Sequence, residues 1–201
     1  MVQHFRPAIV LIVLMTLLLG VLYPFAITGF ANVVFPHRAG GNMILRDGNV
    51  IGSALIGQNF TSDKYFHGRP SATNTPDPND PTKNVDAPYN AANSGASNYG
   101  ATSQALIDRV KADVESWHKA GIAGPIPADA VTTSASGLDP DISPANAFLQ
   151  VARVAKARNL PEDKVRAVVT GAIEGRALGV IGEPRVNVLE LNLALDALPA
   201  S

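Results

Sequence analysis

A long apolar stretch near the N-terminus constrains this chain more than any other feature. Residues 7–35 hold no charged side chain. An α-helix rises about 1.5 Å per residue, so roughly 20 apolar residues cross the ~30 Å hydrocarbon layer of a membrane. Ala8–Ile27 alone reaches that length. We therefore predict a short tail at residues 1–6, a transmembrane helix at residues 7–35 and one domain at residues 36–201.

Four residues of the predicted helix are candidates for packing in the membrane. Thr16 and Gly20 lie four positions apart and therefore on one face, where small side chains let two helices approach closely. Pro24 lacks a backbone N–H, which predicts a kink, and Tyr23 before it is a candidate interfacial ring. We expect this helix to be surrounded by the lipid bilayer and by a partner helix on the Thr16 and Gly20 face.

A cleaved signal peptide is the alternative interpretation of the same stretch. Arg6 would form its charged region, and the small residues around Ala31 have the spacing of a cleavage site. A chain released there would begin at Asn32 and would be a secreted enzyme or binding protein with its site in residues 65–100. The apolar run is longer than the roughly 7–15 residues of a signal core, which favours a retained anchor.

Composition limits what the domain can bind. The chain has 16 Lys+Arg against 17 Asp+Glu and a formal net charge of -1, so no basic excess is present to neutralise phosphates. Nucleic acid is therefore excluded as an expected partner. The sequence has no cysteine, which excludes disulfides, thiol nucleophiles and thiolate metal sites. The charges that flank the apolar stretch nearly balance, so they do not select a side of the membrane.

Turn signals, periodicity and capping residues predict a single α+β domain after the anchor, with mixed helices and strands. Asp47-Gly48 between two apolar runs predicts a β-hairpin. Ser143-Pro144 predicts a helix start, and Pro161 followed by two acids starts a second helix that makes an αα-hairpin. Asn187 predicts the cap of a last helix, although alternation over residues 186–191 also fits a strand. The expected elements are strands at 43–46, 49–51 and 126–134, an extended segment at 52–60, and helices at 103–119, 143–159, from 161 and from 187.

Residues 65–100 are dense in Pro, Asn, Asp, Ser and Gly and predict a long irregular loop. A disordered linker is one interpretation of this segment. The large side chains of Tyr65, Phe66, Arg69 and Tyr99 favour the other interpretation, because such side chains bring burial and contacts that linkers lack. We treat these four residues as candidates for a partner-facing surface.

The residues show no signature of catalysis, metal binding or phosphate binding. Neither the phosphate-binding Gly-rich loop nor the dinucleotide turn is present. The four histidines lie too far apart in sequence for a local zinc pattern. The loop carboxylates Asp77, Asp80 and Asp86 lack the spacing and the glycine of a calcium loop. We therefore expect no catalytic residue, no metal and no tightly bound cofactor.

Several motifs, taken in order, resemble those of one family, the C subunit of the Kdp-type potassium-transporting P-type ATPase. No single motif is specific, but their order and spacing together are. Asp141, where we expect the family to favour histidine, and Tyr99-Gly100 depart from the pattern. The motifs are RPA at 6–8, YP at 23–24, GSALIGQNF at 52–60, YFHGRPSATN at 65–74, SGASN at 94–98, IPADAVTTSASGLDPDISP at 126–144, QVARVAKAR at 150–158 and LGVIGEPRVNVLELNLAL at 178–195.

The resemblance implies a non-catalytic accessory subunit of an ATP-driven, high-affinity potassium uptake pump. The implied partners are the catalytic P-type ATPase subunit, a potassium-channel-like subunit and a small single-helix subunit. The implied location is the bacterial inner membrane, with the N-terminus cytoplasmic and the domain extracytoplasmic. The family is also described as a catalytic chaperone, so ATP is expected through the catalytic subunit, and Gln150 is the candidate that influences the nucleotide. A cytoplasmic nucleotide-binding regulator is the alternative that requires the domain inside the cell.

Overall fold

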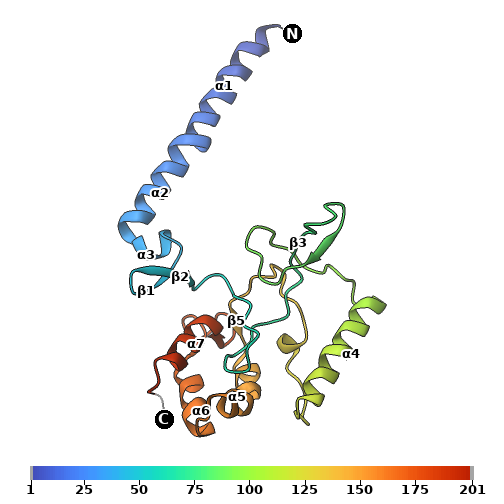
Figure 1. The fold of residues 1–201 in the computed structure, drawn as a ribbon. Coiled ribbons are helices and arrows are strands. Elements are labelled where there is room, and N and C mark those ends of the chain that lie inside the picture. Colours follow the sequence, from blue (N-terminus) through green and yellow to red (C-terminus); the bar gives the residue numbers. More distant parts are fainter. Residues whose placement is uncertain (1, 200–201) are drawn as a thin grey trace. The chain divides into compact units, whose positions relative to one another are not determined.

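The computed structural model describes residues 2–199, which divide into a first unit that ends at Ser53 and a second unit that begins at Ala54. The first unit contains a continuous helical stretch of 30 residues, Phe5–Val34, drawn in blue in Figure 1. Within the described residues it is the one helix long and apolar enough to cross a membrane. An N-terminal apolar helix followed by a mixed domain confirms the predicted α+β class. The stretch consists of α1 (Phe5–Leu17), η2 (Leu18–Leu22) and α2 (Tyr23–Val34), and η1 (Val2–His4) precedes it.

A π-helical segment, η2, interrupts the anchor helix and ends two residues before Pro24. The backbone N–H of Tyr23 donates to the carbonyl of Leu18, five residues earlier. A proline in a regular α-helix clashes with the carbonyl four residues before it, here that of Gly20. A wider turn is one way in which a helix accommodates such a conflict. The sequence predicts a kink at Pro24, and the structure has a π turn at Leu18–Leu22 that includes Gly20.

The first unit ends in the predicted β-hairpin, in which β1 (Met43–Arg46) pairs antiparallel with β2 (Asn49–Ser53). Asp47 and Gly48 form the turn with φ values of 53° and 79°. Positive φ at both central residues is what a two-residue type I′ turn requires. The short helix α3 (Pro36–Ala39) lies between the anchor and this hairpin. The hairpin therefore groups with the anchor and not with the second unit.

Three helices and a small antiparallel sheet enclose the core of the second unit. The helices α5 (Pro144–Arg158) and α6 (Glu162–Gly171) form the predicted αα-hairpin, and α7 (Val188–Asp196) packs against α6. The sheet has the order β5-β7-β6, with β5 (Asp141–Ile142), β6 (Ile173–Glu174) and β7 (Arg185–Asn187). The core side chains are Phe66, Ile142, Ala147, Val151, Val154, Ala155, Val165, Val169, Val186, Val188, Leu191 and Leu195.

Local capping determines where these helices begin and end. The Ser143 hydroxyl accepts the Asn146 N–H at 3.1 Å at the start of α5, and Asn159 ends that helix with a φ of 54°. The Asn187 amide oxygen accepts the Glu190 N–H at 3.1 Å at the start of α7. Asn187 is also the last residue of β7. The strand and helix interpretations of residues 186–191 therefore each hold for part of that segment.

Residues 65–100 are largely irregular, as predicted, and yet belong to the packed domain. Their regular structure is a short hairpin of β3 (Asn74–Pro76) and β4 (Asn84–Asp86). Phe66 has an exposed fraction of 0% and is part of the core cluster. The interpretation of this segment as a disordered linker is therefore wrong, because a core side chain holds it to the domain.

The helix predicted after the long loop is present, whereas the strand predicted next is not. α4 (Gln104–Lys119) follows Ser103, whose hydroxyl makes no capping hydrogen bond. The strand expected at residues 126–134 is replaced by a 3-10 turn, η3 (Ala128–Ala130). The cause is tertiary: the Asp129 carboxylate accepts from the Ser143 N–H at 2.8 Å and from its hydroxyl at 2.9 Å. These bonds fold the segment onto the start of α5. The segment expected to be extended at residues 52–60 is a strand only as far as Ser53.

Candidate functional site

The anchor helix presents Thr16 and Gly20 side by side. A Cβ atom built on Gly20 would lie 3.8 Å from the Thr16 methyl carbon, so the two residues share one face. No side chain in α1, η2 or α2 is buried. Tyr23 and Pro24 follow directly, and Tyr23 is 60% exposed. The geometry leaves a shallow strip where a second helix could approach closely.

The four residues predicted to face a partner from the long loop have different surroundings. The Tyr65 hydroxyl donates to Asp196 at 3.3 Å, and the Arg158 guanidinium lies 4.9 Å from its ring centroid. Phe66 lies in the core and has no surface left for a partner, which corrects its assignment to the partner-facing set. Tyr99 keeps 48% of its surface exposed.

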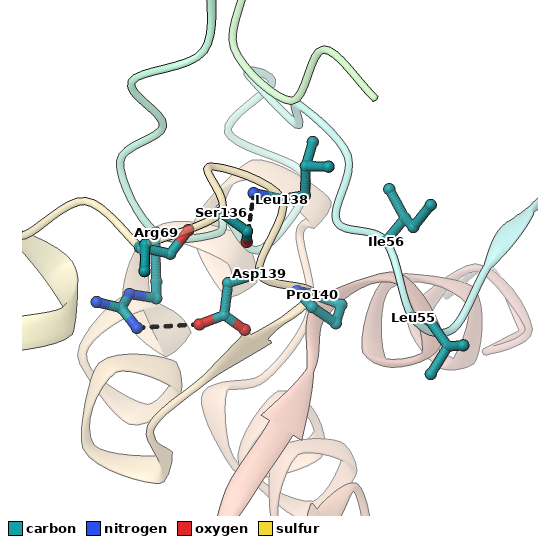
Figure 2. A pocket seen from close by; sticks show the side chains of 9 residues that line it. Leu55, Ile56, Arg69, Ser136, Leu138, Asp139 and Pro140 are labelled. Carbon is teal, nitrogen blue, oxygen red and sulfur yellow. Dashed lines mark hydrogen bonds and ion pairs between the residues drawn. The ribbon is translucent and has the colours of Figure 1, made fainter. Parts of the chain in front are cut away.

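Arg69 lines a pocket of about 520 Å³ in the second unit, shown in Figure 2. Its guanidinium donates to the Asp139 carboxylate at 2.9 Å and to the Thr133 carbonyl at 3.3 Å. Figure 2 shows Arg69 and Asp139 facing each other, while Leu55 and Ile56 come from a separate segment of the chain. The lining residues are Leu55, Ile56, Arg69, Ser134, Ala135, Ser136, Leu138, Asp139 and Pro140.

This pocket holds no pair of groups that could act as nucleophile and base. Its two charges, on Arg69 and Asp139, neutralise each other in one ion pair. Its two serine hydroxyls accept local backbone N–H groups: Ser134 from Gly137 at 2.9 Å and Ser136 from Leu138 at 3.1 Å. Nucleophilic catalysis requires a base within hydrogen-bond reach of the hydroxyl, and no lining side chain supplies one. The pocket therefore has zero net charge and combines apolar walls with one ion pair.

Tyr89 holds the backbone of Arg69 in place. Its hydroxyl donates to the Arg69 carbonyl at 2.7 Å. Its ring occupies the space that a Cβ atom on Gly57 or Gly68 would need, so both positions require glycine. Burial, and then the charge of Asp139, raise the pKa of Tyr89 to about 12. The hydroxyl therefore stays protonated and keeps its role as a donor.

Gln150 lies at the centre of a buried polar cluster, with 1% of its surface exposed. Its amide oxygen accepts from the His67 N–H at 2.8 Å and from Arg153 at 2.7 Å. Its amide nitrogen donates to the His67 carbonyl at 3.1 Å and to the Asn146 side chain at 2.9 Å. A glutamine amide offers two donors and two acceptor positions, so all four are occupied. Gln150 has no free group for a nucleotide and instead clamps the long loop to α5.

Sequence reasoning missed the neighbours that complete this cluster. Asn146 donates to Asp129 at 3.0 Å, and Arg153 donates to the Tyr65 carbonyl at 3.1 Å. On α7, Asn192 clamps the loop in the same way, accepting the Phe66 N–H at 2.8 Å and donating to its carbonyl at 3.0 Å. The spacing of Asn146, Gln150 and Arg153 could have indicated this cluster, because it places three polar residues on one side of α5, next to its apolar residues.

His67 joins the same cluster through its backbone, which bonds to Gln150, and through its ring, whose Nε2 lies 3.4 Å from Arg153. The same Nε2 contacts the Ser62 carbonyl at 3.1 Å. Burial, and then the positive charge of Arg153, lower the pKa of His67 below its ordinary value of 6.5. When the pH falls through 6.5, His67 takes up a proton more readily in the unfolded chain than in the folded protein. The free energy of unfolding therefore falls with acidification in that window.

We expect His67→Gln to reduce this acid sensitivity. Glutamine retains an N–H group that can reach the Ser62 carbonyl, but it does not titrate. The measurement is urea unfolding of the full chain in detergent at about pH 7.5 and about pH 5.5, on either side of the histidine range. The wild type should lose more stability than the variant between the two pH values. An equal loss in both proteins would contradict a buried neutral His67.

The residues from 2 to 199 contain no group of three or more His, Asp or Glu side chains placed to hold a metal ion. The remaining candidates are contact sites, namely the Thr16 and Gly20 face of the anchor and the exposed parts of the domain surface. Neither feature has the constellation of a catalytic centre.

Comparison with known proteins gives consistent matches along the chain. The family model described as KdpC, the K+-transporting ATPase c chain, matches residues 5–197. A protein of Methylobacterium nodulans, named potassium-transporting ATPase KdpC subunit, is 61% identical over 198 residues, covering 98% of this chain and 98% of its own length. Proteins of the same name are 60% identical over 200 residues in Bradyrhizobium diazoefficiens and 56% identical over 195 residues in Methylorubrum extorquens. They cover 100% and 97% of this chain, and 100% and 97% of their own lengths.

Proposed function

The chain belongs to the KdpC family of K+-transporting ATPase c chains, and from this premise we propose that it is a non-catalytic accessory subunit that stabilises the assembled potassium pump. The proposed partners are the catalytic P-type ATPase subunit, a potassium-channel-like subunit and a small single-helix subunit. The observation that carries the proposal is the anchor helix, whose described residues bury no side chain within the chain itself. Such a helix needs surroundings that the rest of this chain does not supply.

Packing in a membrane supplies those surroundings. Lipid contacts the Leu, Ile and Val side chains as well as another apolar helix would, so helix association depends on close backbone approach. The Thr16 and Gly20 face provides that approach, and the π turn at Leu18–Leu22 includes one of its two residues. We therefore assign this face to the contact with another helix of the pump.

We propose that the domain lies outside the cytoplasm of a bacterial cell and the N-terminus inside, in the inner membrane. The chain has no cysteine, so a single introduced cysteine reports the side of the membrane without background. Lys111 is exposed on α4, and Lys111→Cys should react with a membrane-impermeant maleimide on intact cells. Labelling only after the cells are broken would place the domain inside.

We propose that support for ATP binding and hydrolysis passes through assembly of the catalytic subunit and involves no nucleotide contact by this chain. Gln150, the earlier candidate for such a contact, has its four hydrogen-bonding positions occupied inside the domain. Loss of the chain should therefore lower potassium-stimulated ATP hydrolysis in proportion to the loss of assembled complex.

The test of this function compares the wild type with the double variant Thr16→Leu and Gly20→Leu. A tag after Ser201 allows the chain to be purified from native membranes in mild detergent, and the co-purifying proteins are identified and quantified. The wild type should bring the catalytic and channel-like subunits with it. The variant should reduce their yield several-fold, because two added leucine side chains hold the neighbouring helix away.

A matched control carries the same two changes elsewhere on the anchor, at Thr28 and Gly29. These residues lie on the same helical stretch and add the same apolar volume. The control should retain the wild-type yield. Equal yields from all three proteins would remove the docking role of the Thr16 and Gly20 face. A wild-type chain that purifies alone, or that begins at Asn32, would overturn the accessory-subunit function.

A further inference from the structure

An exposed apolar hairpin tip protrudes between β6 and β7, at residues 177–181. The exposed fractions of its large side chains are 91% for Leu178, 76% for Val180 and 62% for Ile181. The tip is well formed, because the backbones of Ala177 and Ile181 exchange two hydrogen bonds of 2.9 Å. Three neighbouring aliphatic side chains are thus held together in solvent at the end of a closed turn.

The backbone of this tip adopts an unfavourable conformation at Leu178, a residue whose side chain is almost fully exposed and is not packed into the domain. Leu178 has a φ of 54°, followed by Gly179 with 78°. The left-handed region is unfavourable for a branched, bulky side chain, and Asn or Gly occupies it more readily. Strain that persists at an exposed leucine points to a contact outside the chain. The domain itself offers no reason to place leucine there.

Charges at the base of the tip favour a protein as that contact. Arg176 pairs with Glu183 at 2.6 Å, and Arg185 pairs with Glu174 at 2.7 Å and with Asp141 at 3.0 Å, so charges of both signs lie at the base of the apolar tip. Segments that insert into lipid carry Trp, Tyr and an excess of Lys or Arg at the interface. Residues 173–187 contain neither aromatic residues nor lysine. An apolar centre with a mixed-charge rim is instead the arrangement of a protein interface.

We propose that the 177–181 tip docks into an apolar socket on another polypeptide subunit of the transport complex. The socket would have an aliphatic floor for Leu178, Val180 and Ile181, and polar groups of both signs at its rim opposite Arg176 and Glu183. This docking rests on the proposed function, since it requires a partner subunit. It adds a second attachment point, on the domain, to the one on the anchor. The fixed turn lowers the conformational cost of docking because the tip is already ordered.

Photo-crosslinking tests which molecule covers the tip. A benzophenone amino acid replaces Val180 in the tagged full chain, membranes are irradiated, and adducts are identified by mass spectrometry. The expected product is an adduct with another subunit. The same probe at the exposed Lys111 of α4 should give none. Adducts with lipid alone, with a second copy of this chain alone, or with nothing would each overturn the proposal.

Leu178→Asn separates docking from folding. Asparagine tolerates positive φ, so the variant should unfold at the same temperature as the wild type or a higher one. The yield of co-purified subunits should nevertheless fall several-fold. The control is Ile107→Asn, which removes an exposed aliphatic side chain from α4 and should keep the wild-type yield. If the wild type brings no subunit, the proposed function fails. If the wild type and Leu178→Asn bring equal amounts, only the docking tip fails.

Discussion

Phe66→Ala is expected to lower the free energy of unfolding of the domain by roughly 3–5 kcal/mol, the usual cost of removing a buried phenylalanine ring. The ring is 0% exposed and belongs to the main core. Its removal leaves a cavity at the point where the long loop enters the domain. Most domains have a total stability of about 5–15 kcal/mol, so this one change would consume a large part of it.

The measurement for Phe66→Ala is urea unfolding of the full chain in detergent, followed by circular dichroism and by the fluorescence of the single tryptophan, Trp117. The matched control is Tyr99→Ala, which removes a half-exposed aromatic ring from the same loop and should cost less than about 1 kcal/mol. Equal losses from the two variants would show that the loop is not held through the core. That outcome would restore the linker interpretation.

Gln150→Leu is the second change with a large expected effect, also roughly 3–5 kcal/mol of unfolding free energy. Leucine has a similar size, so the loss arises from polar groups left buried without partners. These groups are the His67 N–H and carbonyl and the Asn146 amide oxygen, and Arg153 loses its acceptor on this residue. Each buried group without a partner costs about 1–3 kcal/mol.

The matched control for Gln150→Leu is Gln104→Leu, at an exposed glutamine whose amide contacts only Asp108 in α4 among the described hydrogen bonds. It should change stability by less than about 0.5 kcal/mol, the usual range for surface substitutions. Measuring the ATP affinity of the assembled pump together with the stability of each variant distinguishes a structural role of Gln150 from a nucleotide-binding role. A Gln150→Leu chain of wild-type stability with weakened ATP binding would contradict the clamp and support a nucleotide role.

Two proposed attachment points explain how this chain could bind firmly to the assembled pump. In our proposal the anchor contributes a helix contact at Thr16 and Gly20, and the domain contributes the apolar tip at residues 177–181. Linking two weak contacts through one chain makes the second an intramolecular event, which raises overall affinity without new contacts. Disrupting both sites in one chain should therefore reduce the complex yield more strongly than disrupting either alone.

The sequence determined those features of this protein that depend on neighbouring residues. Hydrocarbon length and absence of charge specify the anchor, and a two-residue turn with positive φ specifies the hairpin around Asp47 and Gly48. The starts of α5 and α7 follow from Ser143 and Asn187, whose side chains bond to N–H groups three residues later. Each of these signals lies in a continuous stretch of sequence, an apolar run for the anchor and two to four residues for the turn and the caps, so pattern alone locates it.

Only the tertiary structure decided how the irregular segments are held. Phe66 is predicted from sequence to face a partner, yet Asn192, 126 residues later, bonds both sides of its peptide backbone and fixes it in the core. Asp129 bonds to Ser143, the cap of α5, across 14 residues, so residues 126–134 turn where a strand is predicted. Gln150 changes in the same way from a nucleotide candidate to a clamp. Such bonds join residues far apart in the chain, and no local pattern records their geometry.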